Sequence, residues 1–163
     1  GLLGVRDLMH FEGQAAMELE GLAAQYGPVE PLPGGYVLRE DGAILDFSPM
    51  LSALMGCKDD AAHGAALFHA TVAAGLAEWA IAAVNRKNRP EMKSASIAIG
   101  GGCAMNAVLM SALRGHVAAA GFEVLEARLA PPNDGGLSLG QCWLARRLVS
   151  REASGENSLL TNE

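Results

Sequence analysis

The fold class that this sequence predicts is α/β, with a β-hairpin followed by helices and strands that alternate. Half of the 163 residues are hydrophobic but only 5% are aromatic, and the chain has 20 glycines. Such a composition lets helices approach each other and a sheet closely. In the second half, strand-like and helix-like segments alternate, which is typical of parallel strands joined by right-handed crossovers. The length fits one domain with a sizeable core.

The first segment is expected to be helical from about residue 2 to residue 25, as one or two helices. A break is expected near Phe11-Glu12-Gly13. Gly27-Pro28 ends the segment, because glycine suits a helix C-terminus and proline cannot continue the helix. The chain starts with glycine and an apolar first turn, so we expect it to begin inside a domain.

Residues 36–45 carry a hairpin signal. Glu40-Asp41-Gly42 separates the apolar runs Tyr36-Val-Leu and Ala43-Ile-Leu. Because Asp-Gly tolerates the positive φ angles of tight turns, this pattern predicts a β-hairpin that opens the sheet. Ser48-Pro49 then predicts a short helix, since proline suits the first turn of a helix.

A long helix is expected from Asp59-Asp60, whose negative charge suits a helix start, to about Asn85. Its stretch from Ala65 to Val84 is long and apolar enough to raise the question of a membrane span. That stretch contains His69 and Glu78 and lacks aromatic anchors at its ends. We therefore expect a buried helix of a soluble protein, with a membrane span as the second choice.

The second half is expected to read strand, helix, strand, helix. After a polar loop at 86–93, a strand is predicted at 95–99, a glycine turn at 100–102 and a helix from about Asn106 to Ala120 that Gly121 stops. The later elements are predicted as follows: a strand at 122–125, a rigid loop at 131–136, a helix from Leu137 to about Val149, and a disordered polar tail from Arg151 onward. Since both strands should run in parallel, the loops that follow them should meet at one edge of the sheet, where ligands usually bind.

Charge and cysteine content exclude several classes of protein. The formal net charge is -6, and the 12 basic residues are scattered apart from short groups at 86–89 and at Arg146-Arg147. A nucleic-acid partner is not expected, because phosphate binding normally needs a concentrated basic surface. Cys57, Cys103 and Cys142 show no C-x-x-C spacing, which argues against disulfides and structural zinc and favours a cytoplasmic setting.

Two loops could bind a ligand. The glycines at 100–102 allow close approach to the backbone, and the helix that starts at Asn106 presents amides that favour a phosphate. A tight turn and a simple helix cap are equally good explanations of these residues. In the second loop, Asn133-Asp134-Gly135-Gly136, Asp134 could bind a hard cation or could cap the last helix.

A third candidate is the helix that contains Gln14 and Glu18. These residues are four apart and share a helical face, where they could hydrogen-bond a ribose or a base, although a solvated helical face is the commoner explanation of such residues. His63 and His69 are six apart and do not share a face, so each is expected to be a surface or satisfied core residue. Cys103 is expected to pack, and Trp79 and Trp143 are expected in the core. No catalytic residue is assigned.

Three segments resemble one known family. They are Phe-Glu-Gly-Gln-Ala-Ala-Met-Glu-Leu-Glu at 11–20, Gly-Gly-Cys-Ala-Met-Asn at 101–106, and Ala-Pro-Pro-Asn-Asp-Gly-Gly-Leu-Ser-Leu-Gly-Gln at 130–141. In order and spacing they are similar to the hydrogenase-maturation carbamoyltransferases, the HypF family. The resemblance covers residues 1–150, with 151–163 as a tail. It implies the second lobe of a Kae1-like domain of the ASKHA (ribonuclease H-like) superfamily, and a fragment of a larger enzyme that is inactive alone.

The resemblance also implies a function. The family forms carbamoyl-adenylate from carbamoyl phosphate and ATP, and transfers the carbamoyl group to the C-terminal cysteine of the partner protein HypE. By motif position, Gly101, Gly102 and Asn106 resemble nucleotide-loop residues, and Asp134 resembles a ligand of a divalent metal. The residues that resemble those facing ribose and adenine are Gly13, Gln14 and Glu18.

The chain departs from the family pattern in one respect that concerns the metal. It has no H-x-x-x-H pair of the kind that the family's first lobe supplies, so the metal site is expected to be incomplete. Two alternatives stay open. One is another Kae1-like transferase, such as a tRNA threonylcarbamoyl or an O-carbamoyl transferase, and the other is a non-catalytic nucleotide-binding or assembly module.

Overall fold

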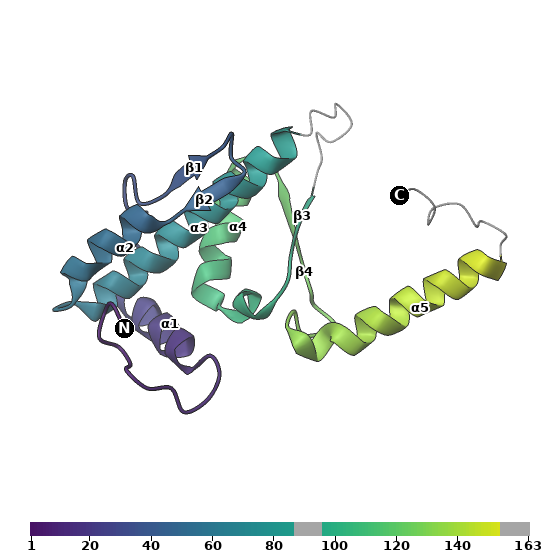
Figure 1. The fold of residues 1–163 in the computed structure, drawn as a ribbon, viewed down its shortest axis with the longest axis horizontal. Coiled ribbons are helices and arrows are strands. Elements are labelled where there is room, and N and C mark those ends of the chain that lie inside the picture. Colours follow the sequence, from purple (N-terminus) through teal and green to yellow (C-terminus); the bar gives the residue numbers. More distant parts are fainter. Residues whose placement is uncertain (87–95, 154–163) are drawn as a thin grey trace.

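The computed structural model describes residues 1–86 and 96–153 and has the predicted α/β order (Figure 1). The elements are α1 (Gln14–Tyr26), β1 (Val37–Arg39), β2 (Ile44–Asp46), α2 (Ser48–Leu54), α3 (Ala61–Arg86), β3 (Ser96–Ile99), α4 (Ala107–Ala119), β4 (Glu123–Glu126) and α5 (Leu137–Ala153). The predicted polar loop and tail fall largely on residues 87–95 and 154–163, which lie outside the described residues. Residues 151–153, expected in the tail, continue α5.

The N-terminal segment differs from the prediction, because residues 1–12 form turns rather than a helix. Gly4 and Gly13 have positive φ angles of 65° and 80°, which are not helical. They leave only residues 5–12 for a helix, and a helix of so few residues is marginal without strong packing. Leu3 is buried in the core and anchors the segment. The predicted end of the helix is confirmed, since Gly27 has a φ of 97° and its N–H donates to the carbonyl of Ala23.

The predicted hairpin is confirmed, but it forms a sheet of its own. β1 and β2 pair antiparallel, with Arg39 opposite Ile44, and Glu40, Asp41 and Gly42 adopt positive φ angles of 51°, 54° and 82°. Contrary to the prediction, this hairpin does not join the parallel strands. A groove of about 860 Å³ lies between the loop at 31–34, β1, α3 and His116 of α4.

The parallel pair is confirmed and fixes the edge at which the two late loops emerge. β3 pairs with β4 in register from Ser96 opposite Glu123 to Ile99 opposite Glu126. Side chains alternate along each strand, so Ile97 and Ile99 pack onto the core while their neighbours face outward. The carboxyl ends of both strands therefore lie side by side.

α3 is the central helix of the described structure. It contributes to both hydrophobic clusters, one with α1 and α2 and one with α4 and the parallel strands. Among the described residues it is the one helix long and apolar enough, by length and composition, to cross a membrane. Small buried residues such as Ala65, Ala73 and Gly75 let the neighbouring helices and the hairpin approach it closely, which is what we expected of a buried helix.

α5 extends away from the rest of the chain (Figure 1) and packs mainly against the short 3-10 turn before it. Its Trp143 is 58% exposed and lies against the guanidinium of Arg147, 5.0 Å from the ring centroid. Trp79 on α3 is 38% exposed. The prediction that both tryptophans are core residues is therefore wrong, because both side chains are exposed.

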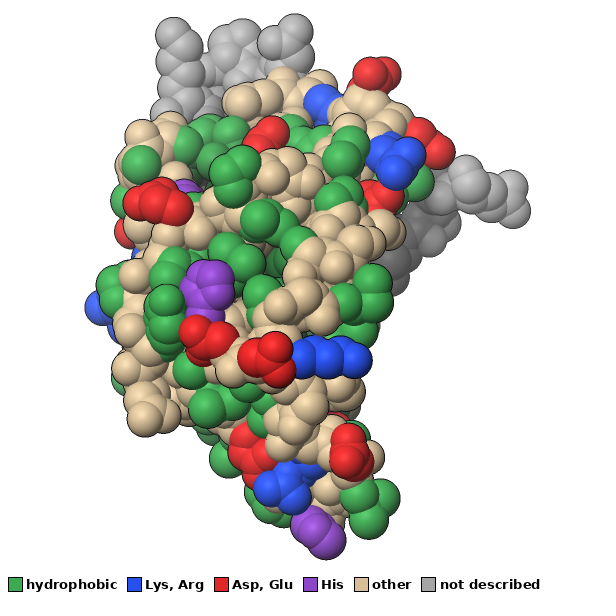
Figure 2. All heavy atoms as spheres, turned by 90° about the vertical axis from the view of Figure 1, so that its left-hand side faces the viewer, with side chains coloured by type: hydrophobic (Ala, Val, Ile, Leu, Met, Phe, Trp, Pro, Cys, Tyr) green, Lys and Arg blue, Asp and Glu red, His purple; other side chains and the backbone are tan. Residues whose placement is uncertain are grey.

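The surface shown in Figure 2 mixes hydrophobic and charged side chains. On this face, the Lys and Arg side chains lie apart from one another, and most have Asp or Glu nearby. Among the described ion pairs, Arg39 pairs with Asp46 and Arg114 pairs with Glu126. These basic groups are individually compensated by acidic partners.

Candidate functional site

The turn between β3 and α4 is built by glycines and a capping asparagine. Gly101 has a φ of 94°, which glycine adopts without strain, and a short 3-10 helix, Gly102–Met105, follows. Asn106 is the N-cap of α4, and its side-chain oxygen accepts a hydrogen bond from the amide of Leu109 at 2.8 Å. Asn106 thus has the capping role that the sequence allowed. The adjacent glycines leave the start of α4 approachable.

α1 meets this turn through Glu20. One carboxylate oxygen of Glu20 accepts a hydrogen bond from the amide of Ala107 at 2.7 Å, across 87 residues of sequence. An acidic group suits this position, because the start of a helix carries unpaired amides and partial positive charge. The segment at 11–20 therefore contacts the first residue of α4, directly after the segment at 101–106.

The loop after β4 meets the same turn from the other side. The amide of Gly101 donates to the carbonyl of Pro132 at 2.7 Å. This bond confirms that the two late loops lie at one edge of the parallel strands. Asn133, rather than Asp134, caps the 3-10 turn Asp134–Gly136, since its side-chain oxygen accepts from the amide of Gly135.

Asp134 is exposed beside this junction, and no side-chain hydrogen bond or ion pair ties it to the described residues. Its carboxylate is therefore available to a ligand. Within residues 1–86 and 96–153, no three His, Cys, Asp or Glu side chains gather as a possible metal site. Asp134 is therefore uncommitted, whereas the neighbouring carboxylates Glu20 and Glu126 already bind Ala107 and Arg114.

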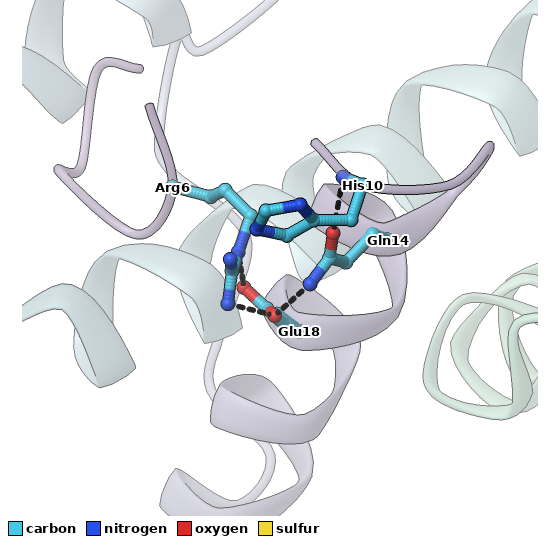
Figure 3. A network of polar contacts seen from close by, with 4 residues as sticks. All are labelled: Arg6, His10, Gln14 and Glu18. Carbon is cyan, nitrogen blue, oxygen red and sulfur yellow. Dashed lines mark hydrogen bonds and ion pairs between the residues drawn. The ribbon is translucent and has the colours of Figure 1, made fainter. Parts of the chain in front are cut away.

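Gln14 and Glu18 do share a face of α1, and they belong to a network of polar contacts there (Figure 3). The guanidinium of Arg6 donates to Glu18 at 2.6 Å, the amide of Gln14 donates to Glu18 at 3.1 Å, and the backbone N–H of His10 donates to Gln14 at 2.8 Å. Hydrogen bonding from Arg6 lowers the pKa of the Glu18 carboxyl. The network fixes the N-terminal segment, and Gly13, at the start of α1, is exposed next to it.

His69 reaches the junction from α3. It is 3% exposed, its Nδ1 lies 2.8 Å from the carbonyl oxygen of Ala65, and its Nε2 lies 2.9 Å from Nδ2 of Asn106. The expectation of a satisfied core histidine is confirmed. Its partner is, however, one of the predicted nucleotide-loop residues. Cys103, expected to pack, is instead exposed on the 3-10 helix between the glycines and Asn106.

Sequence reasoning missed three contributors to this junction: Glu20, His69 and the carbonyl of Pro132. Glu20 and Pro132 lie inside the segments that were singled out, but neither was assigned a contact. His69 carried no signal beyond being a polar residue within an alanine-rich apolar stretch. Such a residue must find a partner when it is buried, and that requirement could have marked it.

Comparison with known proteins places the chain in a defined class. Residues 1–141 match the family described as carbamoyltransferase, Kae1-like domain, second subdomain. The chain belongs to this family, the HypF carbamoyltransferases.

Two curated relatives and two solved structures illustrate the likeness. The chain is 41% identical to carbamoyltransferase HypF2 of Cupriavidus necator, over 89% of the chain and 20% of the relative. It is 40% identical to carbamoyltransferase HypF of Rhizobium leguminosarum bv. viciae, over 93% of the chain and 19% of the relative. The chain thus spans about a fifth of the length of these relatives.

Among solved structures, full-length HypF in its phosphate- and nucleotide-bound form has a TM-score of 0.65 and 34% identity, covering 90% of this chain and 19% of that one. HypF of T. kodakarensis has a TM-score of 0.64 at 24% identity, covering 88% and 18%, and so shows the fold alone. The α/β arrangement with a small parallel sheet is therefore that of the family.

Proposed function

We propose that the junction of α1, the β3–α4 turn and the loop after β4 binds the nucleotide of an ATP-dependent carbamoyltransferase. The observation that carries this proposal is the pair of hydrogen bonds that join Ala107 to Glu20 and Gly101 to Pro132. They bring three segments from distant parts of the sequence to the amide end of one 13-residue helix. The partial positive charge at such an end favours phosphate groups in the space beside Gly101 and Gly102, while the amides of Ala107 and Leu109 already donate to Glu20 and Asn106.

In this proposal the chain is the second lobe of a Kae1-like domain with the ASKHA fold, and the complete protein supplies the chemistry. That protein forms carbamoyl-adenylate from carbamoyl phosphate, water and ATP in the cytoplasm, with release of phosphate and pyrophosphate. It then transfers the carbamoyl group to the thiol of the C-terminal cysteine of HypE during hydrogenase maturation, with release of AMP. Family membership supports the proposal, and a full-length relative has been solved with phosphate and nucleotide bound.

The individual residues have distinct roles. Gly101 and Gly102 leave room for the phosphates beside the backbone, and Asn106 holds the helix start. Gln14 and Glu18 are proposed to face the ribose and adenine next to Gly13 because of their motif positions in the family. In the described structure Gln14 is buried and both residues contact the N-terminal segment, and Glu20 is the residue of α1 that reaches the turn. Glu18 already accepts from Arg6 and Gln14, but a carboxylate has about four acceptor positions, so it can still accept from a ribose hydroxyl.

Asp134 is proposed as one ligand of a divalent metal that neutralises charge on the phosphates. The described residues do not fit such an ion by themselves, because a hard cation takes six or so oxygen ligands and this edge offers one free carboxylate. The remaining ligands are expected from the first lobe and the substrate. The chain's own contribution is to hold the nucleotide in place, and positioning of this kind accounts for much of catalysis in phosphoryl-group chemistry.

The test is a pair of glycine substitutions measured by calorimetric titration with ATP. A Cβ at Gly102 would meet no protein atom within 4 Å and the φ there is not positive, so Gly102→Ala should fold normally. Its methyl group would nevertheless occupy space beside the phosphate loop. We expect Gly102→Ala to weaken ATP binding by roughly tenfold or more, equivalent to about 1.4 kcal/mol. Gly115→Ala, on the exposed side of α4 with equally free space, is the control and should bind like the unchanged chain.

A second measurement separates an enzyme lobe from a non-catalytic binding module. ATP and carbamoyl phosphate are added to the chain alone and to the chain supplied with the first lobe, and pyrophosphate release is followed. Release in the reconstituted protein alone supports the transferase. Binding of ATP without release in either sample would favour the non-catalytic module, and equal ATP affinity of Gly102→Ala and the unchanged chain would contradict the proposed site.

A further inference from the structure

A buried histidine lies directly behind the proposed nucleotide loop, and its protonation state can be derived from its partners. Nδ1 of His69 faces the carbonyl oxygen of Ala65 at 2.8 Å, and a carbonyl can only accept a hydrogen bond. Nδ1 must therefore carry the proton. Nε2 faces the amide nitrogen of Asn106 at 2.9 Å, which can only donate, so Nε2 must be the unprotonated acceptor.

The orientation of the Asn106 amide is fixed by the same argument. Its oxygen accepts from the amide of Leu109 at 2.8 Å, which leaves the nitrogen to donate to His69. Both ends of the amide group are thus held, one by its own helix and one by α3. The second N–H of that nitrogen has no acceptor among the described residues.

We propose that His69 is a positioning residue that fixes the Asn106 amide so that its second N–H is presented to an acceptor oxygen of the bound nucleotide. This inference rests on the proposed nucleotide site and deepens it. An apolar side chain at this position of α3 would avoid the free-energy cost of burying a polar ring. For His69 that cost is offset only by the two hydrogen bonds of the ring. The role of His69 is therefore to hold the loop residue Asn106 in a fixed position relative to α3.

The burial of His69 supports a fixed rather than a mobile arrangement. The side chain is 3% exposed, and the ring of Phe68 packs edge-on against it at 5.4 Å between centroids. Neither the ring nor the Asn106 amide can turn without breaking a hydrogen bond, and the His69 side of that contact has little access to water. Breaking such a bond leaves a buried group unpaired, which is costly.

The first test uses the unchanged chain and needs no ligand. Nitrogen chemical shifts of the His69 ring report which nitrogen bears the proton. The proposal requires a neutral ring with the proton on Nδ1. A proton on Nε2 would overturn it, because such a ring could not accept from Asn106.

The second test compares two variants that each preserve one of the two contacts. His69→Gln places an acceptor near the position of Nε2, whereas His69→Asn can reach only the position of Nδ1. We expect His69→Asn to shift the side-chain amide signals of Asn106 and to weaken ATP binding about tenfold, as the loss of one hydrogen bond to a buried partner implies. His69→Gln should restore affinity to within about threefold of the unchanged chain. His63→Asn is the control, because His63 lies in the same helix but its ring contacts Tyr26, with 5.2 Å between the ring centroids.

Failure of the His69 proposal can be told apart from failure of the proposed nucleotide site. If the unchanged chain and all variants fail to bind ATP, the proposed function is contradicted, while the Asn106 signals still decide whether His69 positions the amide. If His69→Asn binds ATP as tightly as His69→Gln and leaves the Asn106 signals unmoved, His69 is only a packing residue. If His69→Asn does not fold, the ring nitrogen shifts of the unchanged chain and the affinity of His69→Gln settle the question.

Discussion

Glycine at position 75 is required by the two aromatic rings that rest on α3, and replacing it by alanine gives a test of the hairpin's placement. A Cβ at Gly75 would lie 2.8 Å from Cε1 and 2.9 Å from Cζ of Phe47, and 3.1 Å from Cγ of Tyr36. An aromatic ring is rigid, so Phe47 and Tyr36 cannot relieve these contacts by rotating a few terminal atoms. The substitution must push the hairpin and the start of α2 away from the central helix.

The magnitude follows from comparison with a glycine in an open place. Alanine is favoured over glycine in a helix by up to about 1 kcal/mol, and Gly115→Ala should gain that amount because a Cβ there meets nothing within 4 Å. Gly75→Ala gains the same amount and loses about 1–3 kcal/mol through overpacking. Because both variants gain the same helix-propensity term, this term drops out of the difference between their free energies of unfolding. Their free energies of unfolding should therefore differ by about 1–3 kcal/mol, with Gly75→Ala the less stable.

The assay is urea unfolding followed by circular dichroism, with thermal midpoints as a second measure. For a chain of this length, each kcal/mol corresponds to a shift in midpoint of about 2–4 °C. Equal midpoints for the two variants would refute the argument. Such a result would mean that the rings of Phe47 and Tyr36 do not lie on Gly75.

Three further predictions follow from the described contacts. Arg6 lowers the pKa of Glu18 below its ordinary value of 4.5, so this pair should stabilise the chain above that pH and lose its effect as the pH falls through the lowered value; Glu18→Gln should flatten this part of the acid unfolding curve. Burial, together with a hydrogen bond to a carboxylate, raises the pKa of Tyr36 from 10.0 to about 12. The thermal midpoint should therefore fall between pH 10 and 12, and the corresponding fall in Tyr36→Phe should be smaller. A Cβ at Gly136 would collide with the backbone carbonyl of Pro131, so Gly136→Ala should displace the loop and weaken ATP binding, whereas a nucleotide affinity equal to that of the unchanged chain would show that the shape of this loop does not matter.

Local signals in the sequence predicted most of the secondary structure. The Asp-Gly turn predicted the hairpin, Asn106 was correctly considered as a cap, and Gly121 ends α4 with a φ of 83°. Each of these features depends on a few neighbouring residues. The parallel direction of the late strands followed from the helix between them, and with it the meeting of the two loops.

Features that depend on distant parts of the chain could not be predicted in the same way. The contact of Ala107 with Glu20 spans 87 residues, and that of Asn106 with His69 spans 37. No periodicity in the sequence encodes such pairs. At residues 2–10 a local pattern was misleading. The spacing of apolar residues there predicted a helix, but the segment forms turns and Leu3 alone is buried in the core.

Because α3 is a single continuous helix, the two hydrophobic clusters are not independent bodies. Ala65 and Ala66 belong to one cluster, and Ala73 and Ala77, two to three turns further along, belong to the other. If the part of α3 in one cluster unfolds, the other cluster loses the support of the helix on which it packs. Hydrogen exchange of the α3 amides should accordingly be governed by one global opening event, so that heat or denaturant unfolds the cluster with α1 and α2 and the cluster with α4 and the parallel strands together.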